Sequence, residues 1–399
     1  MLVIVVSLLL AAVRTTPTTY ATPIGRSIPK KVLIGYTSGH NYEFVKKAVM
    51  YDHVNVVIWA FMDIVHATTT STSTDAEGER RRNLPQSSLL LPEHVQTGLD
   101  LHRIQHLINE LDGIGYSHVV HLVSFGGWDG QHLDTKLTAQ EWYSIWKNSI
   151  SSSIFHGIDW DLEGNDNLTS MNNVFTVECL DKMGYISTLM KNDGYIVTMA
   201  PPLSYLNFNN SNFSRYVNQT IPDRPWHTEF HYFGSNVYAY LLARYGDYID
   251  LVSIQLYETY SDAALEVYHN GVAAEDYLYN FVYYNVAIRQ QNEASFHVNF
   301  SQDSTLNMQD QIVHLNLSKL VIGLANGWAK KDKHNQKTLY ISATACKDAY
   351  FKLKNSNHGD LTPRGFMYWT IEERGTNEVY LARDIGKFLH DDDDIIITS

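Results

Sequence analysis

The stretch Ile154 to Gly164 reads I-F-H-G-I-D-W-D-L-E-G and places three carboxylates, Asp159, Asp161 and Glu163, two residues apart among apolar residues typical of a buried strand. Because successive side chains of a strand point to opposite faces, all three acids are predicted to share one face. Clustered, buried carboxylates raise one another's pKa and resist ionising without a partner. The cluster is therefore expected to destabilise the folded state. It indicates acid–base catalysis, in which one acid stays protonated beside an ionised neighbour.

A calcium loop and a solvated acidic face are the alternative interpretations of these residues. The D-x-D-x-E-G pattern resembles the start of an EF-hand loop with Gly164 at the sixth position. Ser170, however, stands at the twelfth position, where a bidentate Glu belongs. Ile158 and Trp160 argue against full exposure of the stretch. We therefore expect neither a metal nor a cofactor.

Four further segments occur in the order of landmarks in a known family. They are Ser124-Phe125-Gly126-Gly127-Trp128, Thr198 to Pro202 (T-M-A-P-P), Gln255-Leu256-Tyr257-Glu258 and Met367-Tyr368-Trp369. Together with the acidic stretch, which is similar to the pattern D-G-x-D-x-D-x-E, they resemble glycoside hydrolase family 18, the chitinases and related endo-β-N-acetylglucosaminidases. A lone D-x-D-x-E would be a weak signal, but the ordered set extends over residues 31 to 388 and is specific.

The resemblance implies a role for each acid. Glu163 would protonate the leaving group and later act as base, Asp161 would orient the substrate's 2-acetamido group, and Asp159 would tune Asp161. The acetamido carbonyl would attack the anomeric carbon, which gives an oxazolinium intermediate and net retention. Tyr257 would stabilise that intermediate. The implied substrate contacts are Tyr36, Phe61, Gly126, Gly127, Met199, Ala200, Gln255 and Trp369.

Two residues depart from the family's pattern. His156 stands where the family has its first Asp, and Glu258 follows the sixth-strand Tyr where Asn or Asp is usual. Since the family Asp supports the next carboxylate from behind, His156 is expected to shift the titration of the acids without abolishing it. Both departures put the pH optimum and the rate in doubt more than the type of reaction.

Short apolar runs alternate with amphipathic helical patterns about eight times, which is the period of a TIM (β/α)8 barrel, here a single α/β domain over residues 31 to 388. The predicted strands are Lys31 to Tyr36, Val54 to Phe61, His118 to Phe125, Ile154 to Glu163, Tyr195 to Ala200, Ile249 to Tyr257, Leu320 to Gly323 and Gly365 to Trp369. Helices are predicted over residues 101 to 111, 139 to 149, 174 to 191 and 237 to 245, with another near 339 to 353.

Three connections attract attention. Residues 66 to 90 are polar and rich in Ser and Thr, and predict a surface loop. Only about forty residues separate the last two strands, too few for the α+β insertion that walls the cleft in some family members, and this favours an open cleft and internal cutting. Residues 202 to 248 either line substrate subsites or pack on their own helix; their aromatic residues include Tyr205, Phe208, Phe213, Tyr216, Trp226, Phe230, Tyr232 and Phe233.

The N-terminus predicts a secretory signal. An apolar run from Leu2 to Val13 is followed by Arg14 and a small-residue stretch that ends in Thr19-Tyr20-Ala21, so residues 1 to 21 are expected to be removed; an uncleaved anchor is the alternative, because the charged n-region is missing. Secretion agrees with the sequons, although chance would supply several of them; they begin at Asn167, Asn209, Asn212, Asn218, Asn299 and Asn316. Cys179 and Cys346 are expected to be free thiols. Residues 389 to 399 predict a solvated acidic tail.

Composition limits the partners. The formal net charge of -13 argues against nucleic acid and an anionic membrane surface, whereas 26 Tyr and 8 Trp suit stacking on the sugar rings of a neutral polymer. We expect a monomeric, secreted, endo-acting chitinase whose partner is chitin or another polysaccharide containing N-acetylglucosamine. Two alternatives stay open: an endo-β-N-acetylglucosaminidase that cleaves N-glycans, and a non-catalytic chitin-binding lectin on the same barrel.

Overall fold

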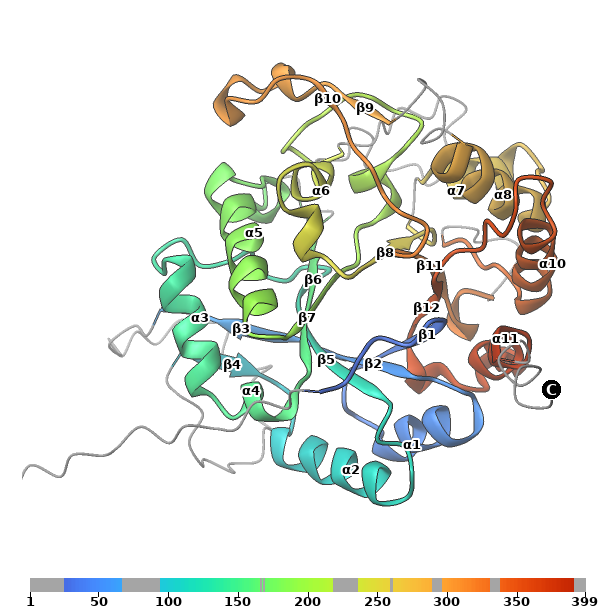
Figure 1. Cartoon of the computed structure of the whole chain (residues 1–399), viewed down its shortest axis with the longest axis horizontal. Helices are drawn as coiled ribbons and strands as arrows, with labels where there is room; N and C mark the ends of the chain where they lie inside the picture. The colour runs from blue at the N-terminus through green and yellow to red at the C-terminus, as the bar shows by residue number, and fades with distance from the viewer. Residues whose placement is uncertain are drawn as a thin grey trace, which may run out of the picture.

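The computed structural model describes residues 25–66, 94–165, 167, 169–217, 236–258, 261–288, 296–330 and 338–390. Their centre is a closed barrel of eight parallel strands (Figure 1). In spatial order the strands are Val32–Thr37 (β1), Val56–Ala60 (β2), Val120–Gly127 (β5), Gly157–Leu162 (β6), Ile196–Met199 (β7), Leu251–Gln255 (β8), Leu320–Ala325 (β11) and Gly365–Trp369 (β12). All eight predicted strands are present, and the predicted (β/α)8 barrel is confirmed.

Helices surround the barrel and connect its strands (Figure 1). They are Tyr42–Tyr51 (α1), Leu101–Gly113 (α2), Ala139–Asn148 (α3), Ser151–Ile154 (α4), Val177–Asn192 (α5), Ala239–Tyr245 (α6), Asp262–Ala264 (α7), Ala274–Asn280 (α8), Ala343–Lys354 (α10) and Leu381–His390 (α11). The predicted helices are all there with shifted ends. The helix expected from residue 174 begins at Val177, for example, because the Thr176 side chain accepts the backbone N–H of Cys179 and caps it.

The predicted start of the acid-bearing strand is wrong by three residues. Ile154 is the last residue of α4, and the Phe155 N–H still donates to the Ser151 carbonyl at 2.9 Å, so this part of the stretch belongs to a helical turn. The strand begins at Gly157. Apolar character alone had suggested a strand here, but it does not distinguish a buried strand from a buried turn of helix.

Side chains of the barrel strands divide into two hydrophobic layers. One cluster fills the barrel interior and includes Ile34, Ile58 and Leu122, with Phe61 and Trp369 packed against it at the carboxyl ends of the strands and Ile28 at the opposite end. The other and larger cluster lies between the barrel and the helices. Alternate residues of each strand therefore point to different layers, which fixes the direction of every side chain at the strand ends.

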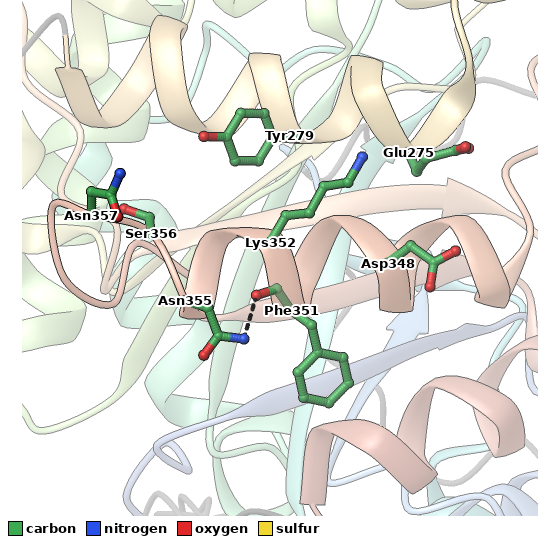
Figure 2. Close-up of a pocket in the computed structure, with 8 residues that line it drawn as sticks. All are labelled: Glu275, Tyr279, Asp348, Phe351, Lys352, Asn355, Ser356 and Asn357. Carbon is green, nitrogen blue, oxygen red and sulfur yellow. Dashed lines mark hydrogen bonds between the residues drawn. The ribbon is translucent and has the colours of Figure 1, made fainter.

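The longest excursion among the described connections follows β8. Residues 256–319 include α7, α8, the wide helical turns Leu265–His269 and Phe281–Ile288, and a small hairpin of His297–Val298 (β9) and Gln311–Ile312 (β10). No pattern in the sequence predicts this hairpin. Between β11 and β12 the described residues form the turn Gly327–Lys330 and α10. A groove between α8 and α10 is lined by Tyr279 and Phe351 among others (Figure 2).

Several expectations concern the ends of the chain and the thiols. The predicted signal segment and residues 67–90 of the predicted polar loop lie outside the described residues. The first two residues of the predicted acidic tail belong to α11, which ends at His390, and residues 391–399 lie outside the described residues. Cys179 on α5 and Cys346 on α10 are both buried and free, as expected. None of the helices in the described ranges is long and apolar enough to cross a membrane.

Candidate active site

Asp159 lies inside the barrel between two hydroxyl groups that the strand register brings to its sides. Ser124 on β5 and Thr198 on β7 are its direct register partners. The hydroxyls of Ser124 and Tyr36 donate to Oδ2 of Asp159 at 2.8 and 2.6 Å, and the Thr198 hydroxyl donates to Oδ1 at 2.5 Å. Asp159 is fully buried, and these three bonds are the means by which a buried carboxylate keeps its charge.

Asp161 and Glu163 continue the same face toward the carboxyl end of β6. Gln255, the last residue of β8, joins them: its amide nitrogen donates to Asp161 Oδ1 at 2.8 Å and to Glu163 Oε1 at 3.2 Å, and it is held by the Ala200 carbonyl at 2.7 Å. A further hydrogen bond links the two carboxyl groups. The predicted common face is thus observed, and the three acids form one connected, buried set.

The three acids differ in their titration. Burial raises the pKa of Glu163 to about 7, against the opposing effect of its hydrogen bonds from Gln255 and Asp161. Burial and the charges of Glu163 and Asp159 hold the pKa of Asp161 well above its ordinary value. Burial also raises the pKa of Asp159, but its three hydroxyl donors counteract this. The three hydroxyl donors therefore make Asp159 the best placed of the three acids to carry a negative charge, whereas a proton is favoured on the pair formed by Asp161 and Glu163.

Aromatic side chains pack next to Tyr36, a hydroxyl partner of Asp159, at the carboxyl ends of the barrel strands. Trp369 ends β12, and its ring lies 5.5 Å from that of Tyr36 and stacks at 5.9 Å on that of Phe61. Gly127 has a positive φ of 84°, and a Cβ there would come within 2.5 Å of the Phe61 ring, so only glycine fits. Tyr257 is half-buried after β8, and burial and the charges of Asp161 and Glu163 hold its pKa well above 10. Tyr257 therefore carries a neutral hydroxyl group near the acids.

The main chain that carries Glu163 is fixed from three sides. The Glu163 carbonyl is hydrogen-bonded to Nε2 of His132 at 3.0 Å, and the Gly164 N–H donates to the Tyr205 hydroxyl at 2.9 Å. The Tyr238 hydroxyl donates to the Leu162 carbonyl at 3.0 Å. These contacts limit the freedom of the acid at the strand end, where a catalytic group has to be held in position.

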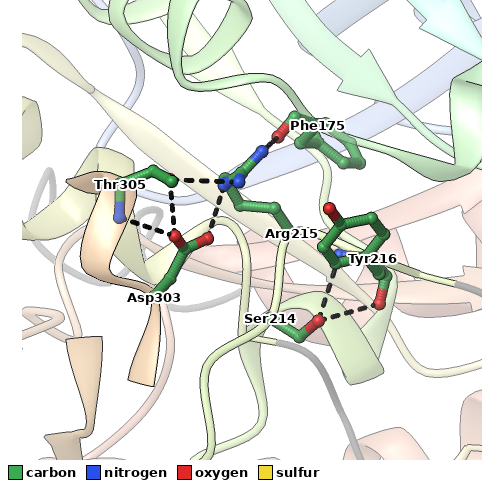
Figure 3. A network of polar contacts seen from close by, with 6 residues as sticks. All are labelled: Phe175, Ser214, Arg215, Tyr216, Asp303 and Thr305. Atoms are coloured by element: carbon green, nitrogen blue, oxygen red, sulfur yellow. Dashed lines mark hydrogen bonds and ion pairs between the residues drawn. The ribbon is translucent and has the colours of Figure 1, made fainter. Parts of the chain in front are cut away.

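A buried ion pair braces the loops beyond this point (Figure 3). Arg215 Nε donates to Asp303 Oδ2 at 2.7 Å, while its Nη1 and Nη2 donate to the Phe175 carbonyl at 2.8 Å and the Thr305 hydroxyl at 3.1 Å. The Phe175 ring in turn contacts His132 at 4.3 Å and Tyr205 at 5.9 Å. The connections after β6, β7 and β8 are thus linked to the backbone of Glu163 through one arginine.

The structure accounts for both departures from the family's pattern. His156 directly precedes β6; its Nδ1 accepts the His121 N–H at 3.0 Å and its ring packs on that of His121. The expectation that it would shift the titration of the acids finds no support, since Asp159 points the other way. Glu258 accepts the backbone N–H and the hydroxyl of Ser204 at 3.0 and 2.5 Å. It therefore anchors the start of the connection after β7.

Not every residue implied by the resemblance has a side chain beside the acids. Met199 is fully buried in the layer between the barrel and the helices, on the strand face opposite Thr198, so its placement indicates packing in place of substrate contact. Gly126 and Ala200 are also buried. Gly126 packs closely against the backbone of Asp161, where a Cβ would come within 2.5 Å of the Asp161 carbonyl oxygen, and the Ala200 carbonyl accepts a hydrogen bond from Gln255. Tyr36 and Gln255 contact the acids directly. Trp369 packs on Tyr36, and Phe61 packs on Trp369 and lies against Gly127.

The aromatic residues of the 202–248 connection mostly pack. Tyr205, Phe208 and Phe213 are buried in the larger hydrophobic cluster, so for these three the packing alternative is confirmed. Tyr216 is 58% exposed. Trp226, Phe230, Tyr232 and Phe233 lie outside the described residues.

The sequon asparagines lie on the surface where they are described. Asn167, Asn209, Asn212 and Asn316 are exposed and Asn299 is partly exposed, whereas Asn218 is outside the described residues. In the part of the chain that the structure describes, no group of three or more His, Cys, Asp and Glu side chains is arranged to hold a metal ion.

Sequence reasoning missed several residues of the site. Ser124 and Thr198 stand inside motifs quoted from the sequence, but only the register between strands shows that they donate to Asp159. His132 and Tyr238 carry no local signal at all. Trp128, which directly follows the two glycines, is 51% exposed at the same end of the barrel, and its place after a strand end was the available signal.

Comparison with known proteins gives structural similarity only. No family model matches the sequence, and no curated protein matches it. One similar solved structure is the catalytic domain of a hyperthermophilic chitinase from Pyrococcus furiosus, with 11% sequence identity, coverage of 94% of this chain and 99% of that chain, and a TM-score of 0.48. Another is the Group IV chitinase of Ostrinia furnacalis in complex with allosamidin, with 12% identity, coverage of 90% of this chain and 99% of that chain, and a TM-score of 0.47. A xylanase-A-amylase inhibitor protein is also similar, with 11% identity, coverage of 90% of this chain and 98% of that chain, and a TM-score of 0.45.

Proposed function

We propose that this chain is a family 18 glycoside hydrolase, a secreted endo-acting chitinase that uses Glu163 as its general acid and base. The observation that carries the proposal is the connected set of Asp159, Asp161 and Glu163, buried on one face of β6 and joined by Gln255. A carboxyl group with a pKa of about 7 can both donate and accept a proton near neutral pH. The five ordered sequence landmarks support the assignment of this acid set to the family.

The chemistry follows from which acid holds a proton. Protonated Glu163 donates to the glycosidic oxygen as the bond to the anomeric carbon breaks, and the substrate's acetamido oxygen forms a bond to that carbon from the other side. The new Glu163 carboxylate accepts the hydrogen bond from Asp161. Water then attacks the anomeric carbon as the bond from that carbon to the acetamido oxygen breaks, and the water gives its proton to Glu163. This step restores the acid, regenerates the acetamido group and leaves the configuration retained.

Internal cutting and secretion are further parts of the proposal. The described residues between β11 and β12 form one turn and one helix, which favours an open cleft that a polymer can cross at any point. The signal-like N-terminus and the exposed sequon asparagines favour a secreted glycoprotein, and we expect a monomer without a membrane anchor after cleavage.

Glu163→Gln tests the proposal directly, because it keeps the shape of the side chain and removes the proton. On defined N-acetylglucosamine oligomers we expect kcat to fall by about 100-fold or more. Glu178→Gln on α5 is the matched control, since Glu178 is exposed and pairs only with Lys182 within the described residues. Anomeric analysis of fresh products by NMR should show retention.

Two outcomes would contradict the proposal. Undiminished hydrolysis by the Glu163→Gln variant would exclude this mechanism, and tight oligomer binding by the wild type without turnover at any pH would favour the lectin. Chitin and the chitobiose core of N-glycans present the same acetamido group, so the mechanism does not distinguish these two substrates. A parallel assay on a glycoprotein shows which of them the enzyme cleaves.

A further inference from the structure

A cavity of about 390 Å³ lies at the end of the barrel opposite the acids. Its walls come from the segment before β1 and from residues at or just before the starts of β7, β8, β11 and β12. The lining includes four cationic side chains, Arg26, Lys191, Lys319 and Arg364, but only one carboxylate, Asp250. In a chain with a formal net charge of -13, this is a local concentration of positive charge.

Two of the four cations are neutralised by carboxylates. Lys191 binds both oxygens of Asp250 at 2.8 Å. Arg26 binds both oxygens of Asp112 at 2.5 and 2.7 Å and also donates to the Val119 carbonyl. Their charges are therefore already compensated and leave little attraction for an external anion.

The other two cations contact only neutral oxygens among the described residues. Lys319 Nζ donates to the Gly246 carbonyl at 2.8 Å, where α6 ends. Arg364 donates from Nε to the Pro29 carbonyl at 2.9 Å and from Nη2 to the Ile28 carbonyl at 3.3 Å. These contacts orient both groups but leave their charges without a counter-charge, and burial lowers the pKa of Arg364.

We propose that this cavity is a binding site for a small dianion bearing a phosphate group, with Lys319 and Arg364 as its charged ligands. The two uncompensated charges match a dianion, and a guanidinium is a strong donor to phosphate oxygens. The volume suits a small molecule. The site lies apart from the acids of β6 and is independent of the proposed hydrolase activity.

Thermal unfolding and calorimetry of the full chain with inorganic phosphate test this site. At pH 7 and constant ionic strength adjusted with chloride, phosphate should bind saturably and raise the unfolding midpoint, because it binds only the folded chain. Lys319→Gln keeps a donor for the Gly246 carbonyl and removes the charge, and should weaken phosphate binding by about tenfold or more. Arg364→Lys should retain binding and Arg364→Gln should lose it.

Lys352→Gln is the matched control. It changes the net charge equally, but Lys352 is exposed on α10 and pairs with Asp276. The site is refuted if wild-type protein shows no saturable effect of phosphate, or if Lys319→Gln, verified as folded by circular dichroism, binds phosphate as tightly as Lys352→Gln. Titration with malonate in place of phosphate shows whether the site selects phosphate; equal affinity for both would overturn the assignment to a phosphate group.

Discussion

The acids of β6 show how position along one strand gives three like groups different protonation states. Asp159 is innermost and receives three hydroxyl donors, whereas Asp161 has one amide donor and charged neighbours on both sides. Charge repulsion and burial therefore act together to raise the pKa of Asp161. Glu163, at the strand end, retains a pKa in the range where a proton can leave and return.

The raised pKa of Glu163 makes a prediction for stability. Its folded-state pKa of about 7 exceeds the unfolded value, so its contribution to stability is present below the unfolded pKa and is lost as pH rises through 7. Glu163→Gln carries no ionisable group at this position, so the variant does not lose this stability as pH rises. The variant should gain stability over the wild type between pH 5 and pH 8, by at most about 3 kcal/mol, in urea unfolding. A stability difference that is the same at both pH values would contradict the shift.

His156 offers a test of side-chain direction. The His156→Asp substitution introduces the residue that stands at this position in the family that the sequence resembles, but at a site just before β6 where the side chain packs on His121. We expect the midpoints of the pH–rate profile on N-acetylglucosamine oligomers to move by less than about 0.3 pH units, while the unfolding midpoint changes. A shift of a full pH unit in the rate profile would show that this position does act on the acids.

The direction of His156 was in fact available from the sequence. Residues 156 and 159 are separated by an odd number of positions, so the strand predicted from Ile154 would have placed them on opposite faces, although β6 itself begins only at Gly157. The same parity rule correctly placed Asp159, Asp161 and Glu163 together. The hydroxyl donors Ser124 and Thr198 were not predictable in this way, because register between strands depends on barrel closure and not on one strand's pattern.

At the scale of elements, strands were predictable and connections were not. Each barrel strand is a buried apolar run, and periodicity identifies it. The hairpin of β9 and β10 has two residues in each strand, too few for a pattern. The aromatic residues of the 202–248 connection likewise left packing and substrate contact as equal alternatives, since composition does not say which way a ring points.

The Arg215–Asp303 pair is predicted to hold these connections together. Both side chains are at most 14% exposed, so removing one partner leaves a buried charge. Arg215→Met should destabilise the chain by about 3–5 kcal/mol, and a compensating Asp303→Leu in the same chain should recover part of this in a double-mutant cycle. The exposed pair Lys352–Asp276 is the control, with an expected coupling below about 1 kcal/mol. Equal coupling in both pairs would refute the bracing role.

At the scale of the whole molecule, stability comes from the two hydrophobic layers without covalent cross-links among the described residues. Burial raises the pKa of the Cys179 thiol to about 12 and that of Cys346 further still. Neither thiolate is therefore available in the native state.

The prediction for the thiols follows directly. A thiol-specific aromatic disulfide reagent should label neither cysteine of native protein and both after unfolding in guanidinium, and the unfolding midpoint should be the same with and without reductant. Rapid labelling of either cysteine before unfolding, or a midpoint lowered by reductant, would contradict the burial seen here.

The pairing of β1 with β12 has a consequence for synthesis. Val32 and Gly365 are register partners, so the last strand to leave the ribosome closes the barrel against the first. Until that moment the nascent chain keeps β1 and β11 as open edges, and such edges invite pairing with other chains. A chain stopped before Gly365 therefore lacks one strand but exposes the unpaired edges of two others, β1 and β11. We expect premature termination to yield aggregates and not a smaller soluble domain.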